Sequence, residues 1–188
     1  MERDVKNQQH DNDPLFIREA VVSKLLDWND CCEAMESALV AATNAGKSAD
    51  KPYSSQTPRT FTSVPDAGVL LTMPGFTGNY KLSSVTGDER HSTLACKLVS
   101  SFGGNSQLNP PIPTILATIL MFDAKTGRMK AVVEGTNITA WRTAAVSLVA
   151  TKFLYYNSRM NSGSDYTLSI CGTGTQVIFL MRNYAIYA

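Results

Sequence analysis

The chain has 188 residues, a formal net charge of +1 and a hydrophobic fraction of 44%. This length suits one domain, or one domain and the beginning of a second. The balanced charge gives no basic excess that would favour nucleic acid or an anionic membrane, so we expect neither as a partner. The sequence contains no stretch long and apolar enough to span a bilayer and its N-terminus is polar, which predicts a cytoplasmic protein.

The cysteines and histidines give no indication of a metal site. Cys31, Cys32, Cys96 and Cys171 show no CxxC spacing, and the adjacent pair is poorly placed to form a disulfide with each other. Only two histidines are available, at positions 10 and 91, both in polar surroundings. We therefore expect reduced, mostly buried thiols and no metal.

The N-terminal part is expected to be helical after a disordered tail at residues 1–14, which has almost nothing to bury. Two helices are predicted in the segment that follows, with a break at residues 28–30 and an end at Gly46. Their apolar positions at helical spacing are Val21, Val22, Leu25, Leu26, Cys32, Met35, Leu39 and Val40. Residues 47–58 are expected to form a polar connector.

Five short β-type runs come next, at residues 59–64, 68–76, 94–102, 115–124 and 129–136. Turn sequences at residues 65–68 and 123–127 are suited to reversing the chain between neighbouring strands. The polar residues 77–93 predict a long surface loop. Together these runs predict an α/β fold with a mainly antiparallel sheet backed by helices.

A strong helix signal follows the last of these runs. Thr139 is the expected N-cap, and the helix is expected to end near Tyr156. Its expected apolar face consists of Ala144, Ala145, Leu148, Val149 and Phe153.

A predicted strand at residues 166–171 then leads into the glycine-containing sequence GTGTQ. A strand, a GxG turn and a helix allow a pyrophosphate to approach the backbone at the helix N-terminus. Val177 occupies the place of the third small residue, so an ordinary glycine turn remains the alternative.

Several motifs in the same order resemble the ornithine cyclodeaminase/mu-crystallin family. The main match is AVVEGTNITAWRTAAVSLVATKFL followed by SICGTGTQ, with PRT at residues 58–60, MPG at 73–75, KLV at 97–99 and ATILMFDAKTG upstream. The similarity runs over about residues 16–176, and the helix motif is most similar to the mu-crystallin, or ketimine reductase, branch.

The resemblance implies a substrate-binding and dimerisation domain at residues 15–160 and the truncated start of a Rossmann domain at residues 161–188. It also implies an NAD(P)H cofactor, a homodimer, and hydride transfer to the imine carbon of a small imino or amino acid. Because most of the cofactor domain is absent from the sequence, we expect this chain to be inactive and to bind the cofactor poorly. We also expect residues 166–188 to be poorly ordered or to pair unnaturally.

The resemblance assigns roles to individual residues. Arg59, Lys97 and Arg142 would bind the substrate carboxylate, and Lys97 would also be catalytic. Two features of the residues agree with this: a lysine in an apolar strand is costly to bury unless paired, and Arg142, expected in the first helical turn, opposes the helix dipole unless an anion is near. The implied cofactor-binding residues are Thr114, Arg142, Thr143, Gly172, Thr173, Gly174, Thr175 and Gln176.

Other interpretations remain open. Arg59 could be a solvated strand-end arginine, Lys97 an edge-strand lysine facing water, and Arg142 a surface arginine. For the whole chain, one alternative is a non-catalytic protein that binds a carboxylate or a thyroid hormone-like ligand. The other is a dimerising remnant of the enzyme.

Overall fold

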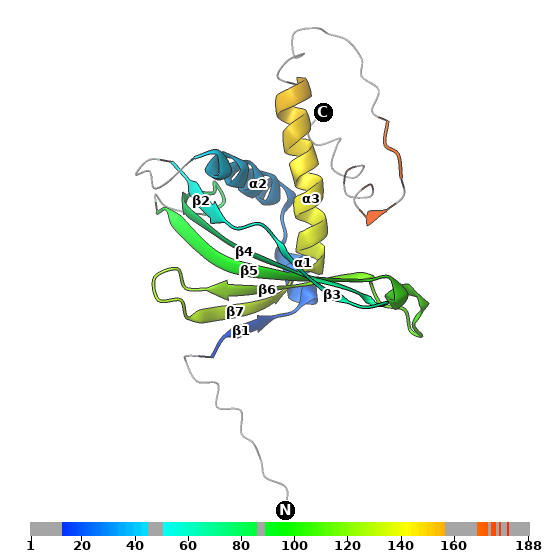
Figure 1. Cartoon of the computed structure of the whole chain (residues 1–188). Helices are drawn as coiled ribbons and strands as arrows, with labels where there is room; N and C mark the ends of the chain where they lie inside the picture. Colours follow the sequence, from blue (N-terminus) through cyan, green and yellow to red (C-terminus); the bar gives the residue numbers. More distant parts are fainter. Residues whose placement is uncertain are drawn as a thin grey trace, which may run out of the picture.

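The computed structural model describes residues 13–44, 51–85, 89–156, 169–172, 174, 175, 177 and 180. A seven-stranded sheet forms one layer and helices form the other (Figure 1), which confirms the expected α/β fold. The strands are β1 (Leu15–Ile17), β2 (Tyr53–Gln56), β3 (Thr60–Val64), β4 (Gly68–Tyr80), β5 (His91–Phe102), β6 (Ile115–Phe122) and β7 (Met129–Glu134). The helices are α1 (Glu19–Leu25), α2 (Trp28–Thr43) and α3 (Thr136–Thr151), with a 3-10 turn at Gly103–Gln107 and a π-helical turn at Lys152–Tyr156.

The sheet is antiparallel except at one edge. Its order is β1-β7-β6-β5-β4-β2, and β3 also pairs with β4. β1 pairs in parallel with β7, which places the start of the described chain beside the last strand of the sheet. β5 therefore lies in the middle, with β4 on one side and β6 on the other.

The strand register divides the side chains of the sheet between two faces, because alternate residues point to opposite sides. Lys97 on β5 lies opposite Met73 on β4 and Ile119 on β6, and Ile119 lies opposite Val133 on β7. Ile119 and Val133 pack in one hydrophobic cluster with Val22 of α1. The sheet face that carries Lys97 is therefore the face covered by the helices.

A second hydrophobic cluster joins α2 to α3. Trp28 of α2 meets Trp141 of α3 edge to face, with ring centroids 5.3 Å apart. Ala144 and Ala145, which are buried, supply small side chains where the two helices meet. This contact fixes the orientation of α3 over the sheet.

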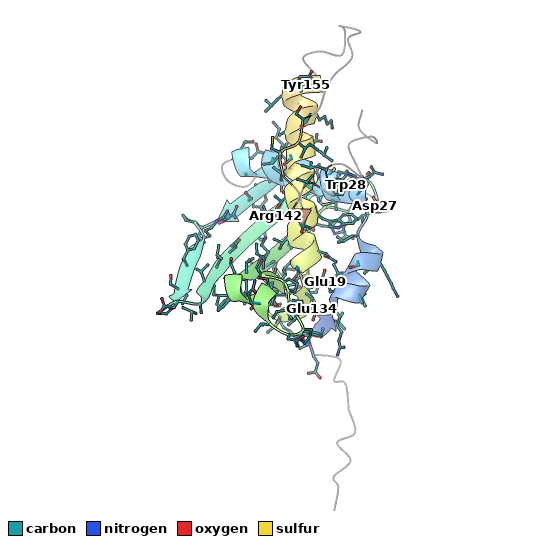
Figure 2. The ribbon with its side chains drawn as sticks, turned by 90° about the vertical axis from the view of Figure 1, so that its right-hand side faces the viewer. Glu19, Asp27, Trp28, Glu134, Arg142 and Tyr155 are labelled. Atoms are coloured by element: carbon teal, nitrogen blue, oxygen red, sulfur yellow. The ribbon has the colours of Figure 1, made fainter. Side chains whose placement is uncertain are left out.

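Two glutamates, Glu19 and Glu134, cap the N-termini of α3 and α1 where these helices meet β7. The Glu19 carboxylate accepts hydrogen bonds from the backbone N–H groups of Thr136 (3.1 Å) and Asn137 (3.0 Å). In return, the backbone N–H of Glu19 donates to the carboxylate of Glu134 at 2.6 Å. Carboxylates at helix N-termini satisfy unpaired N–H groups and favourably oppose the helix dipole. Figure 2 shows Glu19 and Glu134 beside the N-terminal end of α3.

Gly135, the residue before α3, allows the helix to begin close to the sheet. A Cβ atom at this position would lie 2.9 Å from both Cγ1 and Cδ1 of Ile119. Because Ile119 is packed in the α1–β7 cluster, it has little room to move away. The close approach of α3 to β6 therefore requires glycine here.

Two segments predicted to be loops contain strands. Tyr53–Gln56, inside the predicted connector, forms β2 and pairs with β4. β4 also continues to Tyr80 and β5 begins at His91, with a bulge in their register between Thr77 and Tyr80, so the predicted loop is shorter than expected. Backbone pairing with a long neighbouring strand outweighs the weak β-propensity of these polar residues.

Two helix starts also differ from the prediction. α2 begins at Trp28, where a break was expected, because the Asp27 side chain accepts hydrogen bonds from the N–H groups of Asn29 (2.8 Å) and Asp30 (3.1 Å). α3 begins at Thr136, so Thr139 is not its N-cap. The Glu19 carboxylate performs the capping role instead.

Some apolar positions expected to face the core are exposed. The exposed members are Val21, Leu25, Leu39, Val40 and Phe153. α1 has only seven residues and buries Val22 alone, so most of its apolar positions find no partner surface. The cysteines are free, as predicted, but Cys171 is exposed and Cys31 and Cys96 are only partly buried. Within the described ranges, no helix is long and apolar enough to cross a membrane.

The Glu19 cap should contribute measurably to stability. We expect Glu19→Ala to lower the free energy of unfolding by about 1 to 2 kcal/mol, because two N–H groups of α3 lose their acceptor. Urea denaturation would measure this. Glu89→Ala is the control, since Glu89 is exposed and makes no hydrogen bond or ion pair with the described residues. Equal stability of the two variants would contradict the capping role.

Candidate functional site

Lys97 lies on a central strand and is half-buried, so the alternative of an edge-strand lysine facing water is wrong. Its pKa is lowered from the ordinary value of 10.5 to about 8. The largest cause is burial, which disfavours the charged ammonium, followed by the positive charges of Arg142 and Arg59. Lys97 therefore carries a proton that it gives up more readily than an ordinary lysine does.

Arg142 reaches the same region from α3. Because α3 begins at Thr136, Arg142 stands in the second turn and not in the first, so the expected conflict with the helix dipole is weaker. Burial and the charge of Arg59 lower the pKa of its guanidinium. Its Nε atom is buried and has no hydrogen-bond partner among the described residues. Figure 2 shows Arg142 farther along α3 than the glutamate caps.

Arg59 supplies the third positive charge. It directly precedes β3, whose first residue, Thr60, pairs with Thr72 of β4. Its side chain is exposed, yet its charge acts on both Lys97 and Arg142. The structure thus brings together the three residues for which the sequence predicted a common role, from the start of β3, from β5 and from α3.

The three cations lack a compensating carboxylate within the part of the chain that the structure describes. Lys152, a cation of α3's C-terminal end, pairs with Glu36 at 2.9 Å. In contrast, no acidic group is among the causes that shift the pKa of Lys97 or Arg142. Three neighbouring like charges repel one another, and an anion between them would remove this cost. A carboxylate suits such a site because a guanidinium can hold both of its oxygens.

The threonines predicted to contact the cofactor occupy different settings. Thr114 is partly buried just before β6, and its carbonyl accepts a hydrogen bond from the N–H of Phe102 at 2.8 Å. Thr143 lies one turn of α3 beyond Thr139, and its hydroxyl donates to the carbonyl of Thr139 at 2.8 Å. The Thr143 hydroxyl can therefore still accept, but its proton is already used within the helix.

The glycine turn has part of the expected backbone geometry. Gly172 has φ of +129°, which side-chain-bearing residues rarely adopt, and a Cβ on Gly174 would meet no atom within 4 Å. The N–H of Val177 donates to the carbonyl of Gly174 at 3.0 Å, and Thr175 is exposed. Thr173 and Gln176 lie outside the described residues. The local backbone thus leaves room for a phosphate to approach.

The strand predicted before this turn is absent from the described residues. Residues 169–171 are not in a strand, and the remainder of the predicted strand lies outside the described residues. Leu180 packs against the α2–α3 cluster. The prediction that residues 166–188 are poorly ordered falls mostly on residues outside the described ranges and stays untested. The backbone at Gly172 and Gly174 leaves space for a pyrophosphate, but the described residues provide no sheet behind this turn.

One buried polar group was missed because Thr139 was interpreted as a cap. Its Oγ1 atom is buried and has no hydrogen-bond partner among the described residues. Thr139 and Arg142 are three residues apart, a spacing that places side chains on one helix face. This spacing was visible in the sequence and could have identified Thr139 as a site residue.

A cavity of about 470 Å³ lies elsewhere, between α2 and α3. Leu148 and Val149 of α3 line it together with Glu33 and Glu36 of α2, and its lining does not include Arg59, Lys97 or Arg142. Glu36 is paired with Lys152, and Glu33 accepts hydrogen bonds from Ser83. Because these acidic groups already have partners, the cationic cluster is the stronger candidate for a ligand site.

Sequence comparison finds relatives among reductases. The chain is 39% identical to the ketimine reductase mu-crystallin of Rattus norvegicus over 125 residues, which cover 62% of this chain and 36% of the relative. It is 29% identical to the Delta(1)-pyrroline-2-carboxylate reductase of Colwellia psychrerythraea over 120 residues, 64% of this chain and 36% of the relative. The chain thus spans about a third of the length of these curated relatives.

Solved structures of NADH- or NAD-bound enzymes are also similar to this chain. The Thermococcus litoralis Delta(1)-pyrroline-2-carboxylate reductase in complex with NADH and L-proline matches with a TM-score of 0.59 and 33% identity, over 74% of this chain and 37% of that one. An archaeal alanine dehydrogenase dimer with bound NAD shares the fold, with a TM-score of 0.67, 23% identity, and coverage of 92% and 45%. The family model for the ornithine cyclodeaminase/mu-crystallin family matches residues 13–185. The chain therefore belongs to the ornithine cyclodeaminase/mu-crystallin family.

Proposed function

We propose that this chain forms the substrate-binding part of an NAD(P)H-dependent reductase that acts on small cyclic imino acids. The observation that carries the proposal is the convergence of Arg59, Lys97 and Arg142 without a carboxylate partner among the described residues. The likeness to reductases of Delta(1)-pyrroline-2-carboxylate supports the choice of a cyclic imino acid. The substrate carboxylate would supply the missing negative charge.

Each cation has a distinct part in this proposal. Arg142 has a buried Nε–H donor without a partner among the described residues and can hold the carboxylate in a fixed orientation. Arg59 is exposed at the start of β3 and adds attraction from the solvent side. Lys97 is half-buried on the sheet, where its ammonium can bind the ligand carboxylate and also donate a proton to the ligand. We propose Lys97 as the catalytic residue for this reason.

The chemistry needs a hydride and a proton. A reduced nicotinamide, when bound, would supply the hydride for the imine carbon. The electron pair of the C=N bond then moves to nitrogen, and Nζ of Lys97 can donate the proton that this nitrogen takes up. A pKa of about 8 makes Lys97 a better acid near neutral pH than a lysine with its ordinary value.

The cofactor contacts are proposed on less structural support. Gly172 and Gly174 leave the backbone accessible to a pyrophosphate, and Thr175 is exposed beside them. The resemblance adds Thr114, Arg142 and Thr143, together with Thr173 and Gln176. Because the described residues place no strands behind the turn, we expect weak cofactor binding by this chain alone. The alternative function is a protein that binds a carboxylate ligand without catalysing a reaction. A thyroid hormone-like carboxylate would use the same three cations.

The uncovered face of the sheet supports a homodimer as a further part of the proposal. Leu70 and Leu116 lie on either side of Ser100 on this face, and Leu120 lies opposite Val132. Leu70 and Leu116 are each 37% exposed. No described helix packs on this side of the sheet. A second copy of the chain would bury these side chains through a two-fold interface.

Removal of the Lys97 charge should weaken binding of a carboxylate ligand. We expect Lys97→Met to raise the dissociation constant for L-proline by about tenfold, because a charge-assisted hydrogen bond is lost while the length of the side chain is kept. Isothermal titration calorimetry would measure this. Lys125→Met, on the exposed β6–β7 turn, is the matched control and should bind like the wild type. Equal binding by both variants would count against the proposed site.

The affinity should also depend on pH through Lys97. The ligand carboxylate stays ionised above about pH 5, whereas the Lys97 ammonium loses its proton as the pH rises through about 8. Affinity for L-proline should therefore fall between about pH 7 and about pH 9 in the wild type. In Lys97→Met this fall should be absent. A wild-type affinity that stays constant over the range would refute the assignment.

The proposed dimer can be tested by analytical ultracentrifugation. Leu70→Asp combined with Leu116→Asp should shift the chain from dimer to monomer, because charges placed at a two-fold interface are buried and repel each other. Leu25→Asp is the control, since Leu25 is 73% exposed on α1. A wild-type chain that sediments as a folded monomer at all concentrations would overturn the dimer proposal.

A further inference from the structure

The Thr136 hydroxyl at the start of α3 accepts a hydrogen bond from the N–H of Ala117 at 3.2 Å. The hydroxyl groups after it follow a regular pattern, from which only Thr139 departs. Thr143, Ser147 and Thr151 each donate a hydrogen bond to the carbonyl four residues earlier, at 2.8, 3.4 and 2.9 Å. This is the usual way in which a hydroxyl within a helix is satisfied. Thr139 departs from the pattern: its backbone N–H donates to the Gly135 carbonyl at 2.9 Å, but its hydroxyl has no partner among the described residues.

The exception is costly because the Thr139 hydroxyl is buried. A buried polar atom without a hydrogen bond destabilises the fold, and such atoms are rare in native proteins. The carbonyl of Gly135, the N-cap residue of α3, lies four residues before Thr139, so a local bond was available in principle. The fold therefore holds the Thr139 hydroxyl ready for a partner from outside the described chain.

The position of Thr139 indicates what that partner is. Arg142 lies three residues further on, so the two side chains share a face of α3. The Nε of Arg142 is also buried without a hydrogen-bond partner in this part of the chain. Two unsatisfied polar groups, one neutral and one cationic, thus neighbour each other where Lys97 and Arg59 add positive charge.

We propose that Thr139 donates a hydrogen bond to the same ligand carboxylate that Arg142 binds. The inference rests on the proposed function, because it takes the carboxylate at the cationic cluster as given. A carboxylate oxygen accepts several hydrogen bonds, so one ligand can satisfy Thr139 Oγ1 and Arg142 Nε together. The hydroxyl adds a second directed hydrogen bond to the one from Arg142. Thr139 is therefore a ligand-binding residue.

The test compares Thr139→Val, which removes the hydroxyl at nearly constant volume, with Thr139→Ser, which keeps it. Calorimetric titration of the full chain with L-proline should give a dissociation constant about tenfold higher for Thr139→Val and within about threefold of wild type for Thr139→Ser. Thr151→Val is the control, because it removes a hydroxyl bonded within the far end of α3. It should bind L-proline like the wild type.

Stability without ligand separates a binding role from a structural one. The ligand-free Thr139→Val protein should unfold at the same urea concentration as the wild type or at a higher one, since the hydroxyl it loses has no partner among the described residues. A lower midpoint would show that the hydroxyl supports the fold and would overturn the inference. Wild-type affinity in Thr139→Val would overturn it as well. If the wild-type chain itself takes up no L-proline, the proposed function fails and this inference fails with it.

Discussion

The exchange of carboxylate caps between Glu19 and Glu134 is the interaction on which the position of α3 depends. Glu19, the first residue of α1, caps the N-terminus of α3, and Glu134, the last residue of β7, caps the N-terminus of α1. A few atoms therefore fix α1, β7 and α3 to one another. Gly135 adds a second constraint, because it lets α3 start against Ile119 of the sheet. Arg142 is carried by this helix, and its distance from Lys97 follows from where the helix begins.

The cationic cluster shows how a site can be held at a cost to the fold. Lys97 and Arg142 are partly removed from water, and Arg59 adds repulsion to both. Within the described chain, the rest of the structure must keep these groups together without help from an opposite charge. The tryptophan contact between α2 and α3 and the buried alanines beside it provide that packing. Stability elsewhere thus maintains an arrangement that favours a negatively charged ligand.

The sequence predicted the sheet and the long helix because their apolar residues repeat with the period of each element. It also predicted that Arg59, Lys97 and Arg142 share a role, since their motifs resemble those of one family. It did not predict β2, whose polar residues form a strand only through pairing with β4. The predicted start of α3 was wrong for a similar reason. The cap of this helix comes from Glu19, 117 residues away from Thr136, and no local pattern reveals such a partner. The Thr139 hydroxyl, which has no partner among the described residues, lies within the helix because of this earlier start.

The lowered pKa of Lys97 has a consequence for chemical reactivity. A group with a pKa of about 8 is an uncharged amine in roughly one molecule in ten at pH 7. Uncharged amines are nucleophiles, and aldehydes or ketones condense with them to form Schiff bases. The flanking guanidinium groups would draw keto acids to this amine by their carboxylates. If Lys97 acts on an imino acid as proposed, the same arrangement would make it open to modification by α-keto acids.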